Sequence, residues 1–244
     1  MVAYGTGQRP GTHRPRVARS GRRLLVPMVT GTVVGGLALA FVIYTLWPSW
    51  PKAPPAADAP HLPIVVAGET FHVPPAAIRK EVQRRPGPQE RVDLVYSWPA
   101  LDPPPPVPTH RQGSSSGIPV QEGRLFVSIT PNEGAADPIE RFRTIYLRYA
   151  ATARQPAPDG LVLVAFRENT PYQGEDLAYD AEAPEHFVVR CARSEHKLAP
   201  ATCLYERYAG DANITVRFPR DLLSEWQGLA AGIDQLIAEL HPHG

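Results

Sequence analysis

The stretch FVVRCARSEHKLAPATCLYERYAGDANITVRF, residues 187–218, contains three apolar segments of strand length in succession. Their β-branched and aromatic residues recur at alternate positions, which is typical of strands with one buried face. The predicted strands are Phe187–Arg193, Thr202–Tyr208 and Ile214–Phe218. Because short connections favour antiparallel neighbours, this stretch predicts the core of an antiparallel sheet.

The first two of these strands each carry one cysteine, Cys191 and Cys203, and the chain has no others. Neighbouring strands bring such residues within disulfide distance. Closing a loop of this length would stabilise the fold by about 3 kcal/mol. Use of the pair in redox chemistry or metal binding is the alternative, although there is no Cys-x-x-Cys motif to lower a thiol pKa. We therefore predict a structural disulfide.

The C-terminal residues predict a helix of roughly 20 residues with one apolar stripe. A coiled coil with another chain requires more heptads than this segment holds, so we expect the stripe to pack on the protein's own sheet. The stripe consists of Leu222, Trp226, Leu229, Ile233, Leu236 and Leu240.

Upstream segments add further strands and a second helix. Gly68-Glu69 predicts a hairpin turn between two short apolar runs, and Asp137-Pro138 with Glu140 is a typical helix start. The predicted strands are 64–67, 70–73, 91–98, 124–130 and 161–166, the last of them central. We predict an α+β fold over residues 64–244, a mainly antiparallel sheet covered by about two helices, with a flexible Pro/Gly/Ser-rich loop at 99–119.

Ahead of this domain, residues 24–47 (LLVPMVTGTVVGGLALAFVIYTLW) carry no formal charge. A helix of this length spans a hydrocarbon core of roughly 30 Å. Tyr44 and Trp47 lie where aromatic rings meet headgroups, and Arg22-Arg23 precede the segment. The sequence therefore predicts a transmembrane helix at 24–47, with the lipid bilayer as its partner.

The charge distribution predicts the orientation of that helix. Residues 1–23 hold six arginines and no acid, which leaves 19 basic against 24 acidic residues in the rest of the chain. The positive-inside rule places the tail 1–23 in the cytoplasm and the body in the periplasm. The acidic body argues against nucleic-acid binding. The six prolines of residues 48–63 indicate a stiff spacer of about 40–50 Å.

Two cleavable export signals are weaker alternatives to an uncleaved anchor. A secretory signal has a shorter apolar core and a nearby small-x-small site, and the twin-arginine pattern around Arg22-Arg23 fits only loosely. Within the helix, Gly31, Gly35, Gly36 and Ala40 place small residues one turn apart. This spacing suits a homodimer through the helix, although glycine is also common in membrane helices.

Several short patterns suggest chemistry but lack its context. Gly113–Gly117 (GSSSG) matches a nucleophile elbow by letter, without the strand and helix that the elbow requires. The acidic stretch 175–185 could bind calcium, but reads as a solvated loop without a regular calcium-binding pattern. His241 and His243 form a weak terminal metal pair, and the proline run 103–108 could dock into an aromatic groove. The sequence predicts no cofactor or metal site and no catalytic residues.

Several segments together resemble a group of alphaproteobacterial single-pass membrane-anchored periplasmic proteins. They are ETFHVPPAAIR (69–79), RRPGPQERVDLVYSWPAL (84–101), GEDLAYD (174–180), RC (190–191), TCLYER (202–207) and ITVRFPRDLLSEW (214–226). The similarity covers most of residues 64–227. It implies a bacterial inner-membrane location and no particular activity.

The sequence thus favours a non-enzymatic domain that is tethered to the inner membrane and binds or organises a protein partner in the cell envelope. The alternative is an envelope hydrolase whose site combines scattered carboxylates, such as those of the acidic stretch, with His186. A deep pocket lined by titratable groups with perturbed pKa values would favour the hydrolase, and a flat or grooved apolar patch would favour the binding domain.

Overall fold

The computed structural model describes residues 21–46, 55–56, 58–105, 123–193, 201–242 of the chain. It divides into two compact units, Met1–Ala53 and Pro54–Gly244. The predicted loop 99–119 is described only up to residue 105. There the backbone turns back after β4, and Asp102 pairs with Ser97.

The first unit contains α1 (Gly21–Leu46). Every side chain that the structure describes in this helix, 29–45, is exposed. Among the described residues, none of the helices combines the length and the apolar character needed to cross a membrane. The transmembrane helix at 24–47 thus remains a prediction, and its last residue, Trp47, lies outside the described residues.

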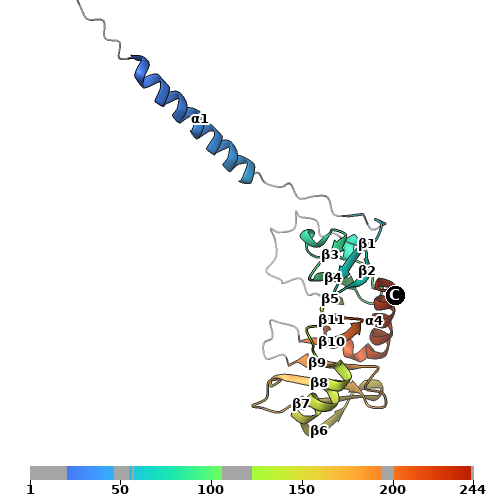
Figure 1. Ribbon diagram of the computed structural model, residues 1–244. Coiled ribbons are helices and arrows are strands. Elements are labelled where there is room, and N and C mark those ends of the chain that lie inside the picture. Colours follow the sequence, from blue (N-terminus) through green and yellow to red (C-terminus); the bar gives the residue numbers. More distant parts are fainter. Residues whose placement is uncertain (1–20, 47–54, 57, 106–122, 194–200, 243–244) are drawn as a thin grey trace, which may run out of the picture. The chain divides into compact units, whose positions relative to one another are not determined.

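The second unit is built on one antiparallel sheet of eight strands in the order β4-β5-β11-β10-β9-β8-β7-β6 (Figure 1). The strands are β4 (Val92–Ser97), β5 (Arg124–Pro131), β6 (Ala150–Pro156), β7 (Leu161–Phe166), β8 (Glu175–Asp180), β9 (Val188–Ala192), β10 (Thr202–Ala209) and β11 (Ala212–Pro219). The sequence predicted six of them, all except β6 and β8. The segment 161–166, predicted as a central strand, is β7, which is paired on both sides, with β8 and with the edge strand β6.

A small second sheet lies beside β4 and β5, in the order β2-β1-β3. Its strands are β1 (Leu62–Val66), β2 (Glu69–Val73) and β3 (Gly87–Pro88). Two 3-10 turns, η1 (Pro75–Ala77) and η2 (Glu81–Gln83), lie between β2 and β3 in the chain. The hairpin turn is Ala67-Gly68, one residue earlier than predicted. Both residues have positive φ, 54° and 87°, as a type I′ turn requires.

The C-terminal helix α4 (Trp226–Leu240) follows the 3-10 turn η6 (Arg220–Glu225) and packs on the protein's own sheets. Its predicted stripe is buried, with Leu229 and Ile233 fully inaccessible, and Leu222 is partly buried beside it. The stripe meets inward side chains of β4, β5, β10 and β11 and of the small sheet. This is the larger of two cores.

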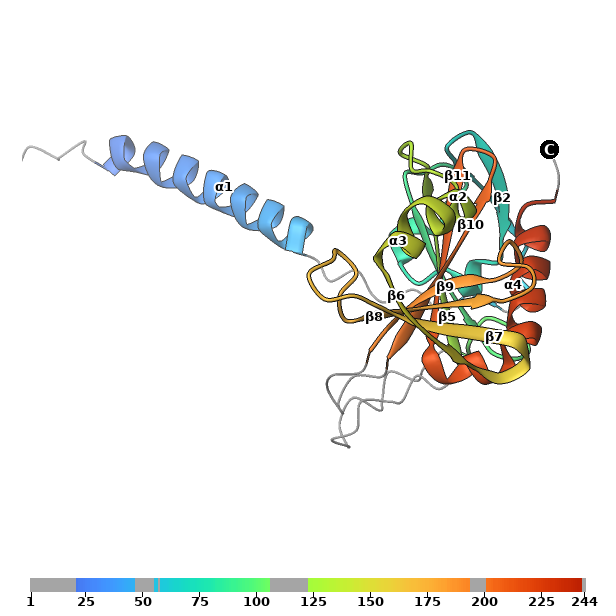
Figure 2. The ribbon, with the colours of Figure 1, turned by 90° about the horizontal axis from the view of Figure 1, so that it is seen from below.

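The smaller core lies on the opposite face of the eight-stranded sheet (Figure 2). There a helical segment runs through α2 (Pro138–Arg141), the π-helical turn η4 (Phe142–Tyr146) and α3 (Leu147–Tyr149). The Asp137 carboxylate caps it by accepting a hydrogen bond from the Ile139 amide at 2.8 Å, as the sequence predicted. The α+β class with two helical covers is confirmed, and each helix covers a different face of the sheet.

Candidate functional site

About half of the acidic stretch 175–185 forms a strand, so the prediction of a solvated loop was wrong for residues 175–180. Residues Glu175–Asp180 form β8, between β7 and β9. Leu177 and Tyr179 project into the smaller core, and Ala178 into the larger one. The strand is therefore buried on both faces, and its acidic residues are placed by the sheet.

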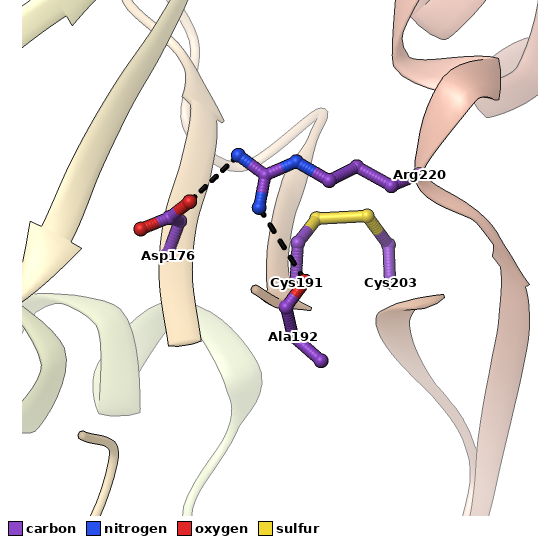
Figure 3. Close-up of a disulfide and its surroundings, with 5 residues drawn as sticks. All are labelled: Asp176, Cys191, Ala192, Cys203 and Arg220. Carbon is purple, nitrogen blue, oxygen red and sulfur yellow. Dashed lines mark hydrogen bonds and ion pairs between the residues drawn. A yellow bond between two sulfur atoms is a disulfide. The ribbon is translucent and has the colours of Figure 1, made fainter. Parts of the chain in front are cut away.

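Asp176 is the centre of an ion-pair cluster beside the disulfide (Figure 3). Its carboxylate contacts Arg193 Nε at 2.8 Å and Arg220 Nη2 at 2.6 Å. Arg220 Nη1 also donates to the Ala192 carbonyl at 3.4 Å, and Arg193 Nη2 to the Phe166 carbonyl at 3.0 Å. The cluster links β8, β9 and the start of η6, so it fixes the end of the sheet.

The predicted disulfide is confirmed within this region. Cys191 and Cys203 lie directly opposite each other on β9 and β10 and are joined. Both residues are buried, in a sheet whose adjoining strand β8 supplies Asp176 opposite Cys191. A buried cross-link between two paired strands acts as a structural element.

Glu175 makes a second ion pair, on the other face of the sheet. Its carboxylate contacts Arg190 Nη1 at 2.8 Å. The Arg190 guanidinium lies over the rings of Tyr172 and Tyr146, at 5.0 and 5.6 Å from their centroids. The pair thus closes one side of the smaller core by cation–π contact.

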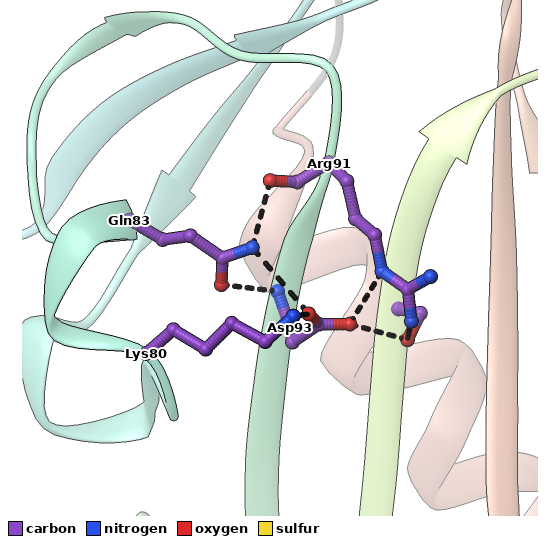
Figure 4. Close-up of polar contacts among 5 residues, drawn as sticks. Lys80, Gln83, Arg91 and Asp93 are labelled. Atoms are coloured by element: carbon purple, nitrogen blue, oxygen red, sulfur yellow. Dashed lines mark hydrogen bonds and ion pairs between the residues drawn. The ribbon is translucent and has the colours of Figure 1, made fainter.

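Asp93 forms the most extensive polar cluster, which the sequence did not reveal (Figure 4). Its side chain is only 3% exposed, although it lies on the face of β4 opposite to the core residues Val92 and Leu94. Lys80 Nζ lies 2.9 Å and Arg91 Nε 2.7 Å from the carboxylate, and the Ser128 hydroxyl donates to it at 2.9 Å. Gln83 completes the cluster, because its amide oxygen accepts from the Asp93 backbone at 3.0 Å.

These contacts hold Asp93 in its ionised form. Burial alone would raise the pKa of the carboxyl group. The hydrogen bonds from Lys80, Arg91 and Ser128 outweigh burial and hold that pKa well below its ordinary value of 3.8. A carboxyl group of this kind has no proton to donate near neutral pH, so the cluster fastens the segment 79–91 onto β4.

This pKa predicts how acid affects stability. A lowered folded-state pKa stabilises the protein above pH 3.8, and that contribution declines as the pH falls through and below this value. We expect Asp93→Asn to lower the free energy of unfolding by about 2 kcal/mol at pH 7, with a difference from wild type that shrinks below about pH 4. Urea unfolding of both proteins between pH 2.5 and 7 measures this, and a difference that does not vary with pH would contradict it.

The remaining candidates lie apart from these clusters. His241 contacts Glu69 Oε2 at 3.0 Å and stacks near Phe71, which joins the end of α4 to β2. His186 is exposed, and its described hydrogen bonds use its backbone. No described contact joins its ring to the carboxylates of 175–185. The residues of GSSSG, His243 and prolines 106 and 108 lie outside the described residues.

Within the described ranges, no group of three or more His, Cys, Asp and Glu residues is placed to hold a metal ion. Two surface hollows are present. One, of about 570 Å³, is lined by residues of 82–91. The other, of about 240 Å³, is lined by Glu175, Arg190, Ala192, Thr202, Cys203, Leu204 and Arg217. Both hollows are lined by charges of both signs, arginines together with Glu90 in the first and with Glu175 in the second.

No protein-family model matches the sequence, and no curated protein is significantly similar to it. Among solved structures, the chain is similar to the immunity protein Smlt3025 of the Stenotrophomonas maltophilia type IV secretion system. The TM-score is 0.50 at 14% identity, over 74% of this chain and 93% of that protein. The likeness is one of fold.

A second solved structure is more distant. The iron-regulated outer membrane lipoprotein FrpD of Neisseria meningitidis aligns over 77% of this chain and 99% of its own length, with a TM-score of 0.39 and 7% identity. The architecture is therefore shared with the immunity protein at the level of the fold.

Proposed function

We propose that this protein is a periplasmic binding domain anchored in the bacterial inner membrane by residues 24–47. The observation that carries the proposal is the exposure of α1. Its described side chains are exposed on every side and include Val33, Leu37 and Phe41, each more than half accessible. A helix that is apolar all round is stable when lipid or protein covers it.

The length of the apolar segment supports a span across the bilayer. The described side chains of α1 begin at Val29, whereas the proposed span begins at Leu24, five residues earlier, and carries no charge through Trp47. The six arginines before it favour a cytoplasmic N-terminus. Export also suits the disulfide, because cysteines oxidise in the periplasm.

The ion-pair clusters support a binding role over the alternative hydrolase. A general acid needs a pKa raised toward neutrality. Asp93 has a lowered pKa, and Asp176 and Glu175 are each paired with arginine. These carboxylates serve the architecture of the sheet. The immunity protein that shares the fold is a precedent for this architecture in a protein associated with a secretion system.

The anchor and the binding role are tested by separate arms of one experiment. Membranes of the native host are washed with alkaline carbonate, and we expect the full chain to stay in the pellet. Photo-crosslinkers placed at several exposed positions of the body are then expected to yield a protein adduct of defined mass. Release of the intact chain by carbonate would contradict the anchor, and the absence of adducts at all positions would contradict the binding role.

The helix itself predicts a further property. If Gly31, Gly35, Gly36 and Ala40 form a dimer face, replacing Gly35 by isoleucine should weaken association of the segment in a membrane two-hybrid assay. Close approach of two backbones requires small residues at this spacing. Gly35 has open space around it in the single chain, so the change leaves the monomer unaffected. Val34→Ile, beside the predicted face, is the control, and equal association of both variants would contradict the dimer.

A further inference from the structure

Half of one sheet face carries no described helix. The larger core occupies one face of the eight-stranded sheet, and the smaller core under α2–α3 occupies the other face over β7–β9. Over β4, β5, β11 and β10, no helix of the described residues covers that second face, although the segment 79–91 covers Asp93 of β4. We call this area the open face; its exposed and partly exposed residues are Val95, Arg124, Phe126, Ser128, Thr215, Arg217, Thr202, Leu204 and Glu206.

The charges without an ion-pair partner on the open face and at its border are basic. The acid on this face, Glu206, is paired with Arg141 of α2 at 3.0 Å, and the buried Asp93 beside it is paired with Lys80 and Arg91. In contrast, Arg79, Arg124 and Arg217 form no ion pair with an acid among the described residues. The part of the chain beyond residue 23 has more acidic than basic residues, so this concentration of unpaired cations is a local segregation of charge.

Three apolar side chains and one of these arginines form one row across the sheet. The strand registers place Val95, Phe126, Arg217 and Leu204 side by side on β4, β5, β11 and β10. The Arg79 guanidinium lies 4.7 Å from the centre of the Phe126 ring, and the Arg217 side chain is exposed. Arginine and aromatic residues are enriched in protein interfaces.

The smaller surface hollow lies on the open face. Thr202, Leu204 and Arg217 line this hollow of about 240 Å³, whereas the hollow of about 570 Å³ is formed by the neighbouring segment 82–91. The hydroxyls of Thr202 and Thr215 add hydrogen-bonding groups. The result is a broad surface with fixed cations, apolar contacts and polar groups.

We infer that the open face binds an acidic polypeptide segment of another envelope protein. Its carboxylates would pair with Arg79, Arg124 and Arg217, and its apolar side chains would lie on Phe126 and Leu204. A flat row of half-buried apolar and basic side chains suits a polypeptide better than a lipid headgroup, because a bilayer is contacted by protruding apolar groups. The inference rests on the proposed binding role and specifies its surface and partner chemistry.

Site-specific crosslinking in the native host tests this surface. The full chain carries benzoylphenylalanine in place of Thr215, on the open face, or of Gln227, on the exposed side of α4. We expect an adduct from position 215 whose attached peptide is rich in Asp and Glu. The double variant Arg79→Glu with Arg217→Glu should reduce its yield roughly tenfold or more, since charged contacts contribute strongly to such complexes.

A matched variant and a lipid probe complete the test. Arg143→Glu, at an exposed arginine of the helical segment, should leave the adduct unchanged. Purified chain in detergent is also offered vesicles of phosphatidylglycerol and phosphatidylethanolamine, and equal retention of wild type and double variant is expected. Circular dichroism confirms that both variants fold.

Three results would overturn the inference. They are an adduct at 215 that survives the double charge reversal, an attached peptide that is neutral or basic, and arginine-dependent binding to the vesicles in place of a protein adduct. Adducts from position 227 alone would contradict the open face as the binding surface while leaving the proposed binding role intact. If no position on the body gave an adduct, both the open face and the binding role would be contradicted.

Discussion

Asp176→Ala is expected to lower the free energy of unfolding by about 2–4 kcal/mol. The substitution leaves the guanidiniums of Arg193 and Arg220 without their acid partner. Their side chains are 40% and 25% exposed, so water partly compensates for the lost pair, and the expected loss lies below that of a fully buried ion pair. Urea unfolding of the full chain in detergent measures the change.

Glu182→Ala is the matched control, because Glu182 belongs to the same acidic stretch but is exposed. We expect it to change the free energy of unfolding by less than about 0.5 kcal/mol. A double-mutant cycle of Asp176→Ala with Arg220→Ala should show a positive coupling of about 1–3 kcal/mol. Equal effects of Asp176→Ala and Glu182→Ala would contradict the assignment of Asp176 as the centre of the cluster.

Removal of the disulfide has the second largest expected effect. We expect Cys191→Ala with Cys203→Ala to lower the free energy of unfolding by about 3 kcal/mol, because the cross-link no longer restricts the unfolded chain. The cysteines are 12 positions apart and directly paired on β9 and β10. Reduction of wild type by dithiothreitol should reproduce the loss, and the double variant should not respond to the reductant. A reductant effect of the same size on the variant would contradict this origin.

The disulfide and the helix stripes could be predicted from the sequence because their signals are local. Cys191 and Cys203 lie in apolar alternating segments separated by a short connection. The apolar stripe of α4 repeats with helical spacing, and Asp137 precedes a proline at a helix start. In each case neighbouring residues carry the information, so no tertiary contact has to be known.

The polar clusters could not be predicted, since they depend on contacts distant in sequence. Asp176 meets Arg220, 44 positions away, only because the start of β8 and the ends of β9 and β11 lie at the same end of the sheet. β8 itself was missed for two reasons. It is buried on both faces, and its acidic residues at 175, 176 and 180 obscured the apolar signal of Leu177 and Tyr179. Asp93 alternates as an outward residue of β4, and the segment 79–91 then covers it.

The edge strand β6 shows a different limit. Residues Ala150–Pro156 (AATARQP) have few apolar side chains and are mostly exposed. They form a strand because β7 offers unpaired backbone groups, and a register irregularity between Ala150 and Arg154 accommodates the fit. Backbone pairing of this kind has no side-chain pattern from which it could be recognised.

The central claim, that residues 24–47 cross the inner membrane and carry the body into the periplasm, is tested most directly by fusing alkaline phosphatase after Gly244. This reporter is active only where its own disulfides form, outside the cytoplasm. We predict activity in intact cells equal to that of an exported reference fusion. Activity no higher than that of a cytoplasmic reference, with the fusion protein intact, would contradict the proposed topology.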